Sequence, residues 1–310
     1  MLKIKCYCQK LRYLMKYFFY TVTFLAISIH TSSLSAQSLR IEWDSLYNAR
    51  YPEALHDVIR MRDGRLAAVG EANVPGKGKQ GLFLIFDAVT GQIVHREDFG
   101  DFRDDVFYSL AEAKDGNFYL VGATNTGKKN EWKGWLVLLN ERGKEIMISE
   151  YDKNNVTRFE KIVWTKSGIG LMAARSSHHE GSLLVLPVNG RRIGDPAASV
   201  GDGKVEDLVA MVPDARQGIW LCGNARQSDN SRKGDVWVAQ LDDRGAGLSS
   251  NYIRGKIYKK LHGATPNVEG GLLLAGEIWD SPAGDNNAWL LETGTDEGST
   301  VPIVFGAPGI

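Results

Sequence analysis

The chain has 310 residues, with 37 basic and 37 acidic side chains and a formal net charge of zero at pH 7. A chain of this length can form one all-β domain with a sizeable hydrophobic core. The balanced charge gives no basic surface of the kind that binds nucleic acid, so we expect no nucleic-acid partner.

The first 36 residues have the three parts of an export signal. Five basic side chains precede a mostly apolar run from Tyr17 to Ile29, and small residues from Ser33 to Ala36 follow it. The apolar run is shorter than the about 20 residues that a membrane-spanning helix needs. We therefore expect residues 1–36 to be a signal peptide. An uncleaved membrane anchor is the alternative.

Cleavage after this signal would leave residues 37–310 with a net charge of −5 and one cysteine, Cys222. We expect this mature chain to be periplasmic, attached to the outer surface or secreted, with no transmembrane segment. A single thiol forms no disulfide framework, so the hydrophobic core must hold the domain together.

A strand pattern recurs five times along the mature chain. In each copy a hydrophobic run ends in a small residue, and the successive gaps are 52, 52, 49 and 53 residues between Gly70, Gly122, Ala174, Gly223 and Gly276. A period of about 50 residues that contains several short strands is typical of β-propeller blades. The repeats span about 54–101, 104–152, 157–203, 205–256 and 258–306.

The second copy shows the strands of one repeat most clearly. Alternating or apolar runs predict strands at Phe107–Ala113, Phe118–Gly122, Trp135–Leu139 and Glu145–Tyr151. Asp115-Gly116 favours a tight turn between the first two strands, because glycine adopts positive φ without steric cost. We therefore predict an all-β propeller of four-stranded antiparallel blades.

The number of blades depends on how the ring closes. Five blades are favoured, but six or seven are possible, because Leu39–Tyr47 has the pattern of an additional strand. The chain also ends in a Phe-Gly sequence that elsewhere leads into a new copy. An N-terminal strand often closes a propeller by pairing with the last blade.

The copies share Asp-Gly before an apolar strand that ends in Gly, then Trp-Leu-Val-x-Leu, then an Asn/Asp-x-x-Gly turn. With these motifs the chain resembles the secreted bacterial β-propeller repeat proteins with WD40-like or quinoprotein-like blades. The resemblance implies blade geometry and no particular activity. His95 stands where the quinoprotein family places a docking tryptophan, and nothing resembles its cofactor-binding cysteine pair, so we expect no cofactor.

We expect long polar loops between the second and third strands, at 72–80, 124–133, 175–181, 224–234 and 278–287. Long loops are usually retained for binding. The face that they form carries two tryptophans that could anchor a partner. The predicted binding residues are Trp132, Trp279, Lys128, Lys129, Arg232 and Lys233. Alternatively, the loops are solvated and the tryptophans pack on the blades.

One acidic residue lies at or just before the first strand in each of the first four copies, namely Asp57, Asp105, Glu160 and Asp207. First strands line the central channel of a propeller, so these carboxylates would gather at its mouth. There they could hold Ca²⁺ or provide the acid and base of a glycan hydrolase. Alternatively, each carboxylate accepts a backbone N–H of the neighbouring blade.

The sequence favours a non-enzymatic, monomeric propeller that binds a protein or a glycan through its long-loop face. The alternatives are a propeller hydrolase acting on glycans, and a regulatory or sensor propeller that serves a separate effector domain. The sequence contains no Gly-rich phosphate loop and no Gly-x-Ser-x-Gly elbow. An enzyme stays open, since a propeller glycosidase needs only scattered carboxylates.

Overall fold

The structure is a computed structural model. It describes Trp43 and the ranges 51–125, 127–128, 131–177, 182–201, 203–214, 218–226, 234–254, 258–267, 270–279, 287–293 and 303–305. Contacts divide the chain into two units, Met1–Asp44 and Ser45–Ile310, and the second unit contains every strand of the described ranges. No helix among the described residues is long and apolar enough to cross a membrane. The strand expected at Leu39–Tyr47 lies outside the described residues.

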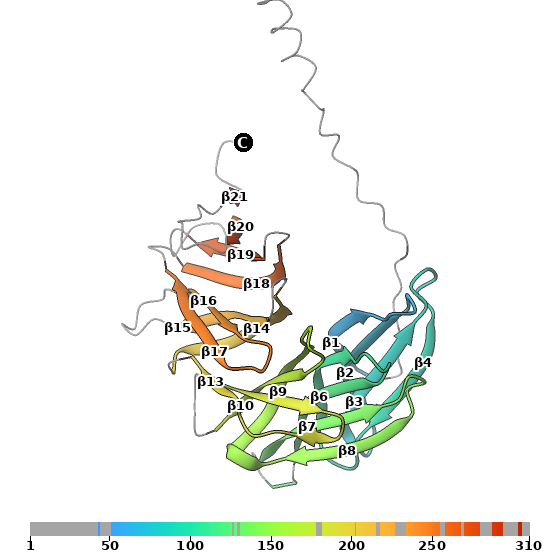
Figure 1. Ribbon diagram of the computed structural model, residues 1–310. Helices are drawn as coiled ribbons and strands as arrows, with labels where there is room; N and C mark the ends of the chain where they lie inside the picture. Colours follow the sequence, from blue (N-terminus) through green and yellow to red (C-terminus); the bar gives the residue numbers. More distant parts are fainter. Residues whose placement is uncertain are drawn as a thin grey trace, which may run out of the picture. The chain divides into compact units, whose positions relative to one another are not determined.

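The described residues form five antiparallel sheets in chain order (Figure 1). The first sheet contains β1 (Glu53–Arg60), β2 (Leu66–Val74), β3 (Gly78–Phe86) and β4 (Ile93–Phe99). The second contains β5 (Asp105–Glu112), β6 (Phe118–Asn125), β7 (Trp132–Leu139) and β8 (Glu145–Tyr151), and a 3₁₀ turn, η1 (Lys153–Asn155), follows it.

The third sheet contains β9 (Val156–Trp164), β10 (Gly170–Ser176), β11 (Leu183–Asn189), β12 (Arg192–Ile193) and β13 (Ala198–Val200). Its outer edge is divided, because β12 and β13 both pair with β11. The fourth contains β14 (Val205–Pro213), β15 (Ile219–Arg226), β16 (Gly234–Leu241) and β17 (Gly247–Ile253). The fifth contains β18 (Tyr258–Pro266), β19 (Leu272–Trp279), β20 (Asn287–Thr293) and β21 (Ile303–Phe305).

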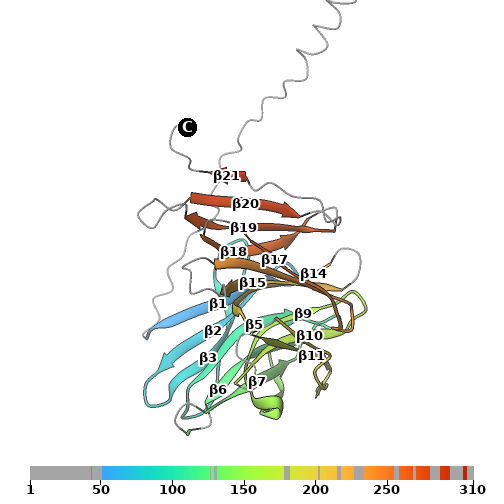
Figure 2. The same ribbon diagram turned by 90° about the vertical axis from the view of Figure 1, so that its left-hand side faces the viewer.

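The first strands of consecutive sheets lie next to one another. β1 contacts β5, β5 contacts β9, β9 contacts β14, and β14 contacts β18. Figure 2 shows the sheets following one another from β1 to β21. Four-stranded antiparallel sheets that meet along their first strands are the blades of a propeller. The predicted all-β propeller fold is confirmed.

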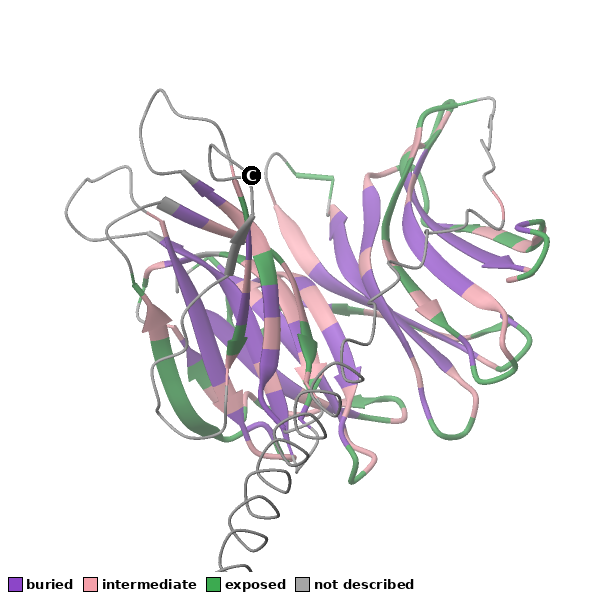
Figure 3. Cartoon of the chain, turned by 90° about the horizontal axis from the view of Figure 1, so that it is seen from above, coloured by how far each residue is buried: buried purple, intermediate pink, exposed green. Residues whose placement is uncertain are grey.

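The hydrophobic core lies between neighbouring sheets. Between the first two, Phe83 packs with Phe107, which stacks on Trp135 with ring centroids 4.4 Å apart and an interplanar angle of 2°. Figure 3 shows that buried residues run along the strands, whereas the turns are exposed. Because each inner sheet is apolar on both faces, stacking against its neighbours stabilises it.

Two of the predicted loops differ from the structure. In the first copy β2 extends to Val74 and β3 begins at Gly78, so the loop expected at 72–80 is a tight turn. In the second copy Trp132 is the first residue of β7 and pairs with Asn125. Backbone pairing continues through these polar residues because a hairpin ladder needs no apolar side chains to form its hydrogen bonds.

Each first strand contains a β-bulge at the same place. The residue before the bulge pairs with the recurring small residue of the second strand, as Phe107 does with Gly122. The extra residue then has no partner in the ladder. The five extra residues are His56, Tyr108, Glu160, Val209 and His262.

The bulge explains why the small residue recurs. A Cβ on Gly122 would lie 1.8 Å from the carbonyl oxygen of Val106, and one on Gly70 would lie 1.8 Å from that of Ala54. The corresponding distances are 2.1 Å for Gly223 and 2.0 Å for Gly276. The bulged strand therefore brings its backbone against the second strand, where four of the five sheets have glycine. The third sheet has Ala174.

We expect Gly122→Ala to destabilise the fold, because the new methyl group would collide with backbone atoms that cannot rotate away. Overpacking of this kind costs about 1–3 kcal/mol, which lowers the melting temperature by about 2–4 °C per kcal/mol in a domain of this size. Gly263→Ala is the matched control, since nothing lies within 4 Å of its added Cβ. Equal melting temperatures for the two variants would contradict the steric explanation.

Candidate functional site

Three of the five extra residues face one cavity of about 430 Å³. A cavity of this volume is within the range of about 300–1,000 Å³ that is usual for small-molecule sites. Its walls come from β1, β5, β9 and β14, the first strands of four consecutive sheets. The lining residues are His56, Tyr108, Arg158, Glu160, Lys161, Asp207 and Leu208. We call this space the bulge cavity.

Glu160 is held on one wall by two arginines. Its Oε1 accepts hydrogen bonds from Arg158 Nε at 2.9 Å and from Arg175 Nε at 3.0 Å, and its Oε2 accepts one from Arg175 Nη2 at 3.2 Å. Arg175 also donates from Nη1 to the carbonyl oxygen of Val205 at 3.1 Å. The side chains of Glu160 and Arg175 are only 11% and 12% exposed. This ion pair therefore fixes the position of the bulge between β9 and β14.

The opposite wall carries two rings and a second charge pair. The rings of His56 and Tyr108 lie with their centroids 5.7 Å apart. His56 Nε2 is 3.7 Å from a carboxylate oxygen of Glu71, whose other oxygen accepts a hydrogen bond from Lys79 Nζ at 2.8 Å. This hydrogen bond raises the pKa of Lys79. Burial raises the pKa of Tyr108, so its hydroxyl keeps its proton at neutral pH.

Several polar groups of the bulge cavity have no protein partner. Within the described part of the chain, no hydrogen bond or ion pair engages the hydroxyl of Tyr108, the ammonium group of Lys161 or the carboxylate of Asp207. Tyr108 and Lys161 are half-buried, and polar groups in such places normally find partners in the protein or in water. Here all three groups are left available to a ligand.

The structure separates the four carboxylates that we expected at one mouth. Glu160 and Asp207 line the bulge cavity. Asp57 instead binds across to the next sheet, where its Oδ2 accepts hydrogen bonds from Ser109 Oγ at 2.6 Å and from Leu110 N at 3.3 Å. Asp57 therefore has the alternative role for such carboxylates, in which it caps a backbone N–H of the neighbouring blade.

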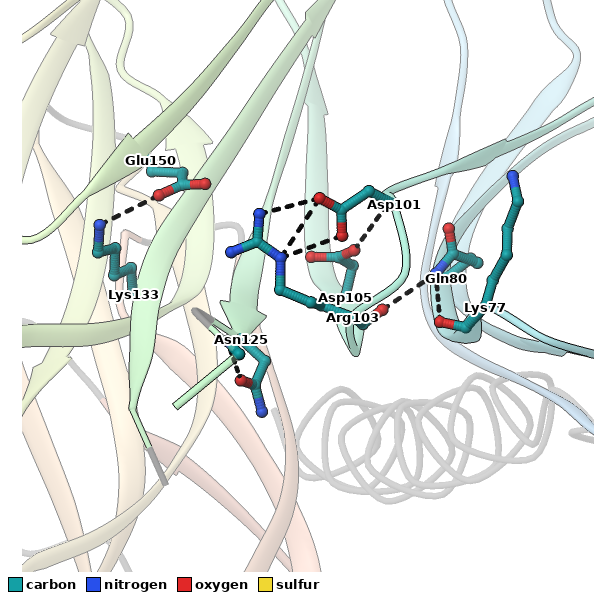
Figure 4. A network of polar contacts seen from close by, with 9 residues as sticks. Lys77, Gln80, Asp101, Arg103, Asp105, Asn125, Lys133 and Glu150 are labelled. Carbon is teal, nitrogen blue, oxygen red and sulfur yellow. Dashed lines mark hydrogen bonds and ion pairs between the residues drawn. The ribbon is translucent and has the colours of Figure 1, made fainter. Parts of the chain in front are cut away.

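Asp105 lies elsewhere again, near the start of β5, and is 3% exposed. Figure 4 shows its Oδ2 accepting a hydrogen bond from Asp101 N at 3.3 Å, beside the ion pair of Asp101 with Arg103. Burial raises the pKa of Asp105 to about 6, although a hydrogen bond from Thr124 acts in the opposite direction.

The four carboxylates do not occupy equivalent positions in their sheets. Asp57 pairs with Val69, Asp105 with Thr124 and Asp207 with Asn224, whereas Glu160 is the extra residue of a bulge. A bulge adds one residue to the strand and turns every residue before it to the other face. Spacing along the sequence therefore misaligned them.

The equivalence that does recur was not visible from the sequence spacing alone. In three sheets the extra residue is paired with the residue that follows the recurring small residue. The pairs are His56 with Glu71, Glu160 with Arg175, and His262 with Glu277, the last at 3.1 Å. The charged residues after Gly70, Ala174 and Gly276 were the available signal, and only the strand register relates them to the bulges.

Much of the predicted long-loop site is paired or lies outside the described residues. Lys128 is 3.3 Å from Glu131, and Lys133 is 3.1 Å from Glu150 (Figure 4). Trp132 is half-buried. The side chain of Trp279 and the residues Lys129, Arg232 and Lys233 lie outside the described residues. Binding at this face stays a prediction.

Two further expectations concern metal and thiol chemistry. In the ranges that the structure describes, no three His, Cys, Asp or Glu side chains are grouped to hold a metal ion, and the calcium site stays a prediction. Cys222 is fully buried, as predicted, and burial raises the pKa of its thiol to about 12. Such a thiol forms little of the reactive thiolate.

A scan against protein-family models and a search of curated proteins find no match. Among solved structures, the chain is similar to a candidate exo-beta-1,3-galactanase from Bifidobacterium bifidum s17, with 11% identity over 81% of this chain and 90% of that chain and a TM-score of 0.48. For a glucose dehydrogenase the values are 11%, 79%, 83% and 0.49. For Drosophila Semaphorin 1a, extracellular domains 1–2, they are 10%, 78%, 53% and 0.48. Likenesses at this level assign neither an activity nor a ligand.

We expect the stability of the protein to fall as the pH rises from about 4 to 6, with Asp105 as one cause. Its pKa is raised to about 6 in the folded state from 3.8. The folded state therefore binds more protons than the unfolded state in this window, and stability falls as they are released. The loss from this one group is about 1–2 kcal/mol.

Urea unfolding at pH 4.5 and pH 7.5 measures this loss. Asp105→Asn should reduce it, because the amide stays neutral and can still accept a hydrogen bond from Asp101 N. The exposed Asp195 provides the control variant, Asp195→Asn, which should keep the pH dependence of the wild type. An unchanged pH dependence in Asp105→Asn would contradict the assignment.

Proposed function

We propose that this chain is a non-enzymatic, ligand-binding propeller whose bulge cavity takes a small, hydroxyl-rich ligand of the saccharide class. One observation carries the proposal: unpartnered polar groups from consecutive sheets line the same cavity. If the expected signal peptide directs export, the cavity would meet saccharides outside the cytoplasm.

The chemistry of the lining suits sugar hydroxyl groups. A hydroxyl both donates and accepts hydrogen bonds. Lys161 and Arg158 can donate to it, and Asp207 can accept from it. The tilted rings of His56 and Tyr108 add an apolar edge on which the C–H face of a sugar could pack. The volume of about 430 Å³ is sufficient for one or two sugar units.

The same geometry favours binding over glycoside hydrolysis. Hydrolysis by the usual route uses a pair of carboxyl groups on either side of the scissile bond. Both oxygens of Glu160 accept hydrogen bonds from arginines, so neither is available to protonate a leaving group. Among the described lining residues, Asp207 is then the one carboxylate without a partner.

We expect Tyr108→Phe to weaken saccharide binding about tenfold, because it removes one hydroxyl that no protein group uses. A typical hydrogen bond contributes about 0.5–1.5 kcal/mol, and 1.4 kcal/mol corresponds to a factor of ten. Titration calorimetry with a panel of neutral and acidic mono- and disaccharides measures the affinity.

The matched control is Tyr151→Phe, which removes the hydroxyl of a buried tyrosine in β8, away from the bulge cavity. It should leave saccharide affinity unchanged. If the wild type binds no saccharide of the panel, the proposal is overturned. Equal binding by Tyr108→Phe and the wild type would remove the bulge cavity as the site.

A further inference from the structure

We infer that the ligand of the bulge cavity is an anionic saccharide, whose carboxylate or sulfate group binds between Arg158 and Lys161. The inference rests on the proposed function and names the class of saccharide. It depends on how the charges of the bulge cavity are paired.

The bulge on β9 places the two cations on either side of Glu160. Arg158 directs Nε and Nη2 to a single oxygen of Glu160, at 2.9 Å and 2.8 Å. Within the described chain no hydrogen bond engages its other terminal nitrogen, Nη1. The side chain of Arg158 is 44% exposed, so this nitrogen is accessible to a ligand.

The negative charge of Glu160 is already balanced by a different arginine. Arg175 donates two hydrogen bonds to Glu160 and is itself nearly buried, with 12% of its side chain exposed. The charges of Arg158 and Lys161 are therefore not cancelled by Glu160 alone. Around β9 and β14 these three cations face two carboxylates, Glu160 and Asp207, which leaves one positive charge in excess.

Lys161 is the group with the strongest need for an anion. It lines the bulge cavity and is half-buried, and no described residue pairs with its ammonium group. Taking a charge partly out of water is unfavourable unless an opposite charge compensates. Hydrogen bonds between charged partners are stronger than neutral ones, and the planar guanidinium beside it matches a carboxylate or a sulfate.

The remaining free groups suit the neutral part of such a ligand. Asp207 is an acceptor on β14, the strand next to β9, and it would repel an anionic group placed against it. It can instead accept a hydrogen bond from a sugar hydroxyl. A ligand with one anionic group and several hydroxyls fits this set better than a neutral sugar or a simple anion.

The test compares matched pairs of probes on the full chain. Methyl glucuronide and glucose 6-sulfate supply the two kinds of anionic group, and methyl glucoside is the neutral counterpart. We expect at least one anionic probe to bind the wild type about tenfold more tightly than the neutral one. This preference should shrink as salt is raised, since ions screen charges.

Lys161→Met should reduce the preference for the anionic probe to about threefold or less. Methionine keeps an apolar stem of similar length and removes the charge. Lys144→Met is the matched control, because Lys144 is exposed in the turn before β8 and lies outside the bulge cavity. It should keep the preference of the wild type, and circular dichroism checks that both variants fold.

The outcomes separate this inference from the proposed function. If the neutral probe binds as tightly as both anionic probes, the inference is overturned and the saccharide site stands. If inorganic sulfate binds as tightly as glucose 6-sulfate, the cation pair stands and the saccharide assignment fails. If no probe binds, both fail. A preference that survives in Lys161→Met would exclude Lys161 as its source.

Discussion

The close backbone contact at each β-bulge is the constraint on which the rest of this structure depends. One extra residue in the first strand brings a carbonyl oxygen within about 2 Å of the place where a Cβ would be on Gly70, Gly122, Gly223 and Gly276. Glycine is required there because any side chain would collide with backbone atoms. The sequence period of about 50 residues is therefore also the period of a bulge.

The bulges also determine how the sheets are joined. A bulge interrupts the ladder, and nearby backbone groups then need other partners. A side chain of the preceding sheet provides them: Asp57 binds Leu110 N, Ser109 binds Ile162 N at 3.4 Å, and Asn224 binds Leu261 N at 2.7 Å. These links connect successive first strands, and they explain why Asp57 serves the fold and does not line the bulge cavity.

The same feature makes the candidate site. Extra residues project from the strand without a pairing partner, and β-bulges are often found beside functional sites for this reason. His56, Tyr108 and Glu160 take such positions around one cavity. The pairing of Glu160 with Arg175 leaves Arg158 and Lys161 with charge to offer a ligand. A raised carboxyl pKa occurs instead at Asp105, which is buried away from this cavity.

The sequence by itself determined the repeat, the strand type and most strand positions, because periodic apolar runs and tight-turn residues are local signals. Glu145–Tyr151 is β8 as predicted, and Cys222 is buried because its place in the repeat is apolar in the other copies. Only the tertiary structure decided which residues share a position. A bulge shifts the register by one residue without a local sequence signal, so the grouping of Tyr108, Glu160 and Asp207 follows from strand pairing between distant segments and from the packing of one sheet on the next.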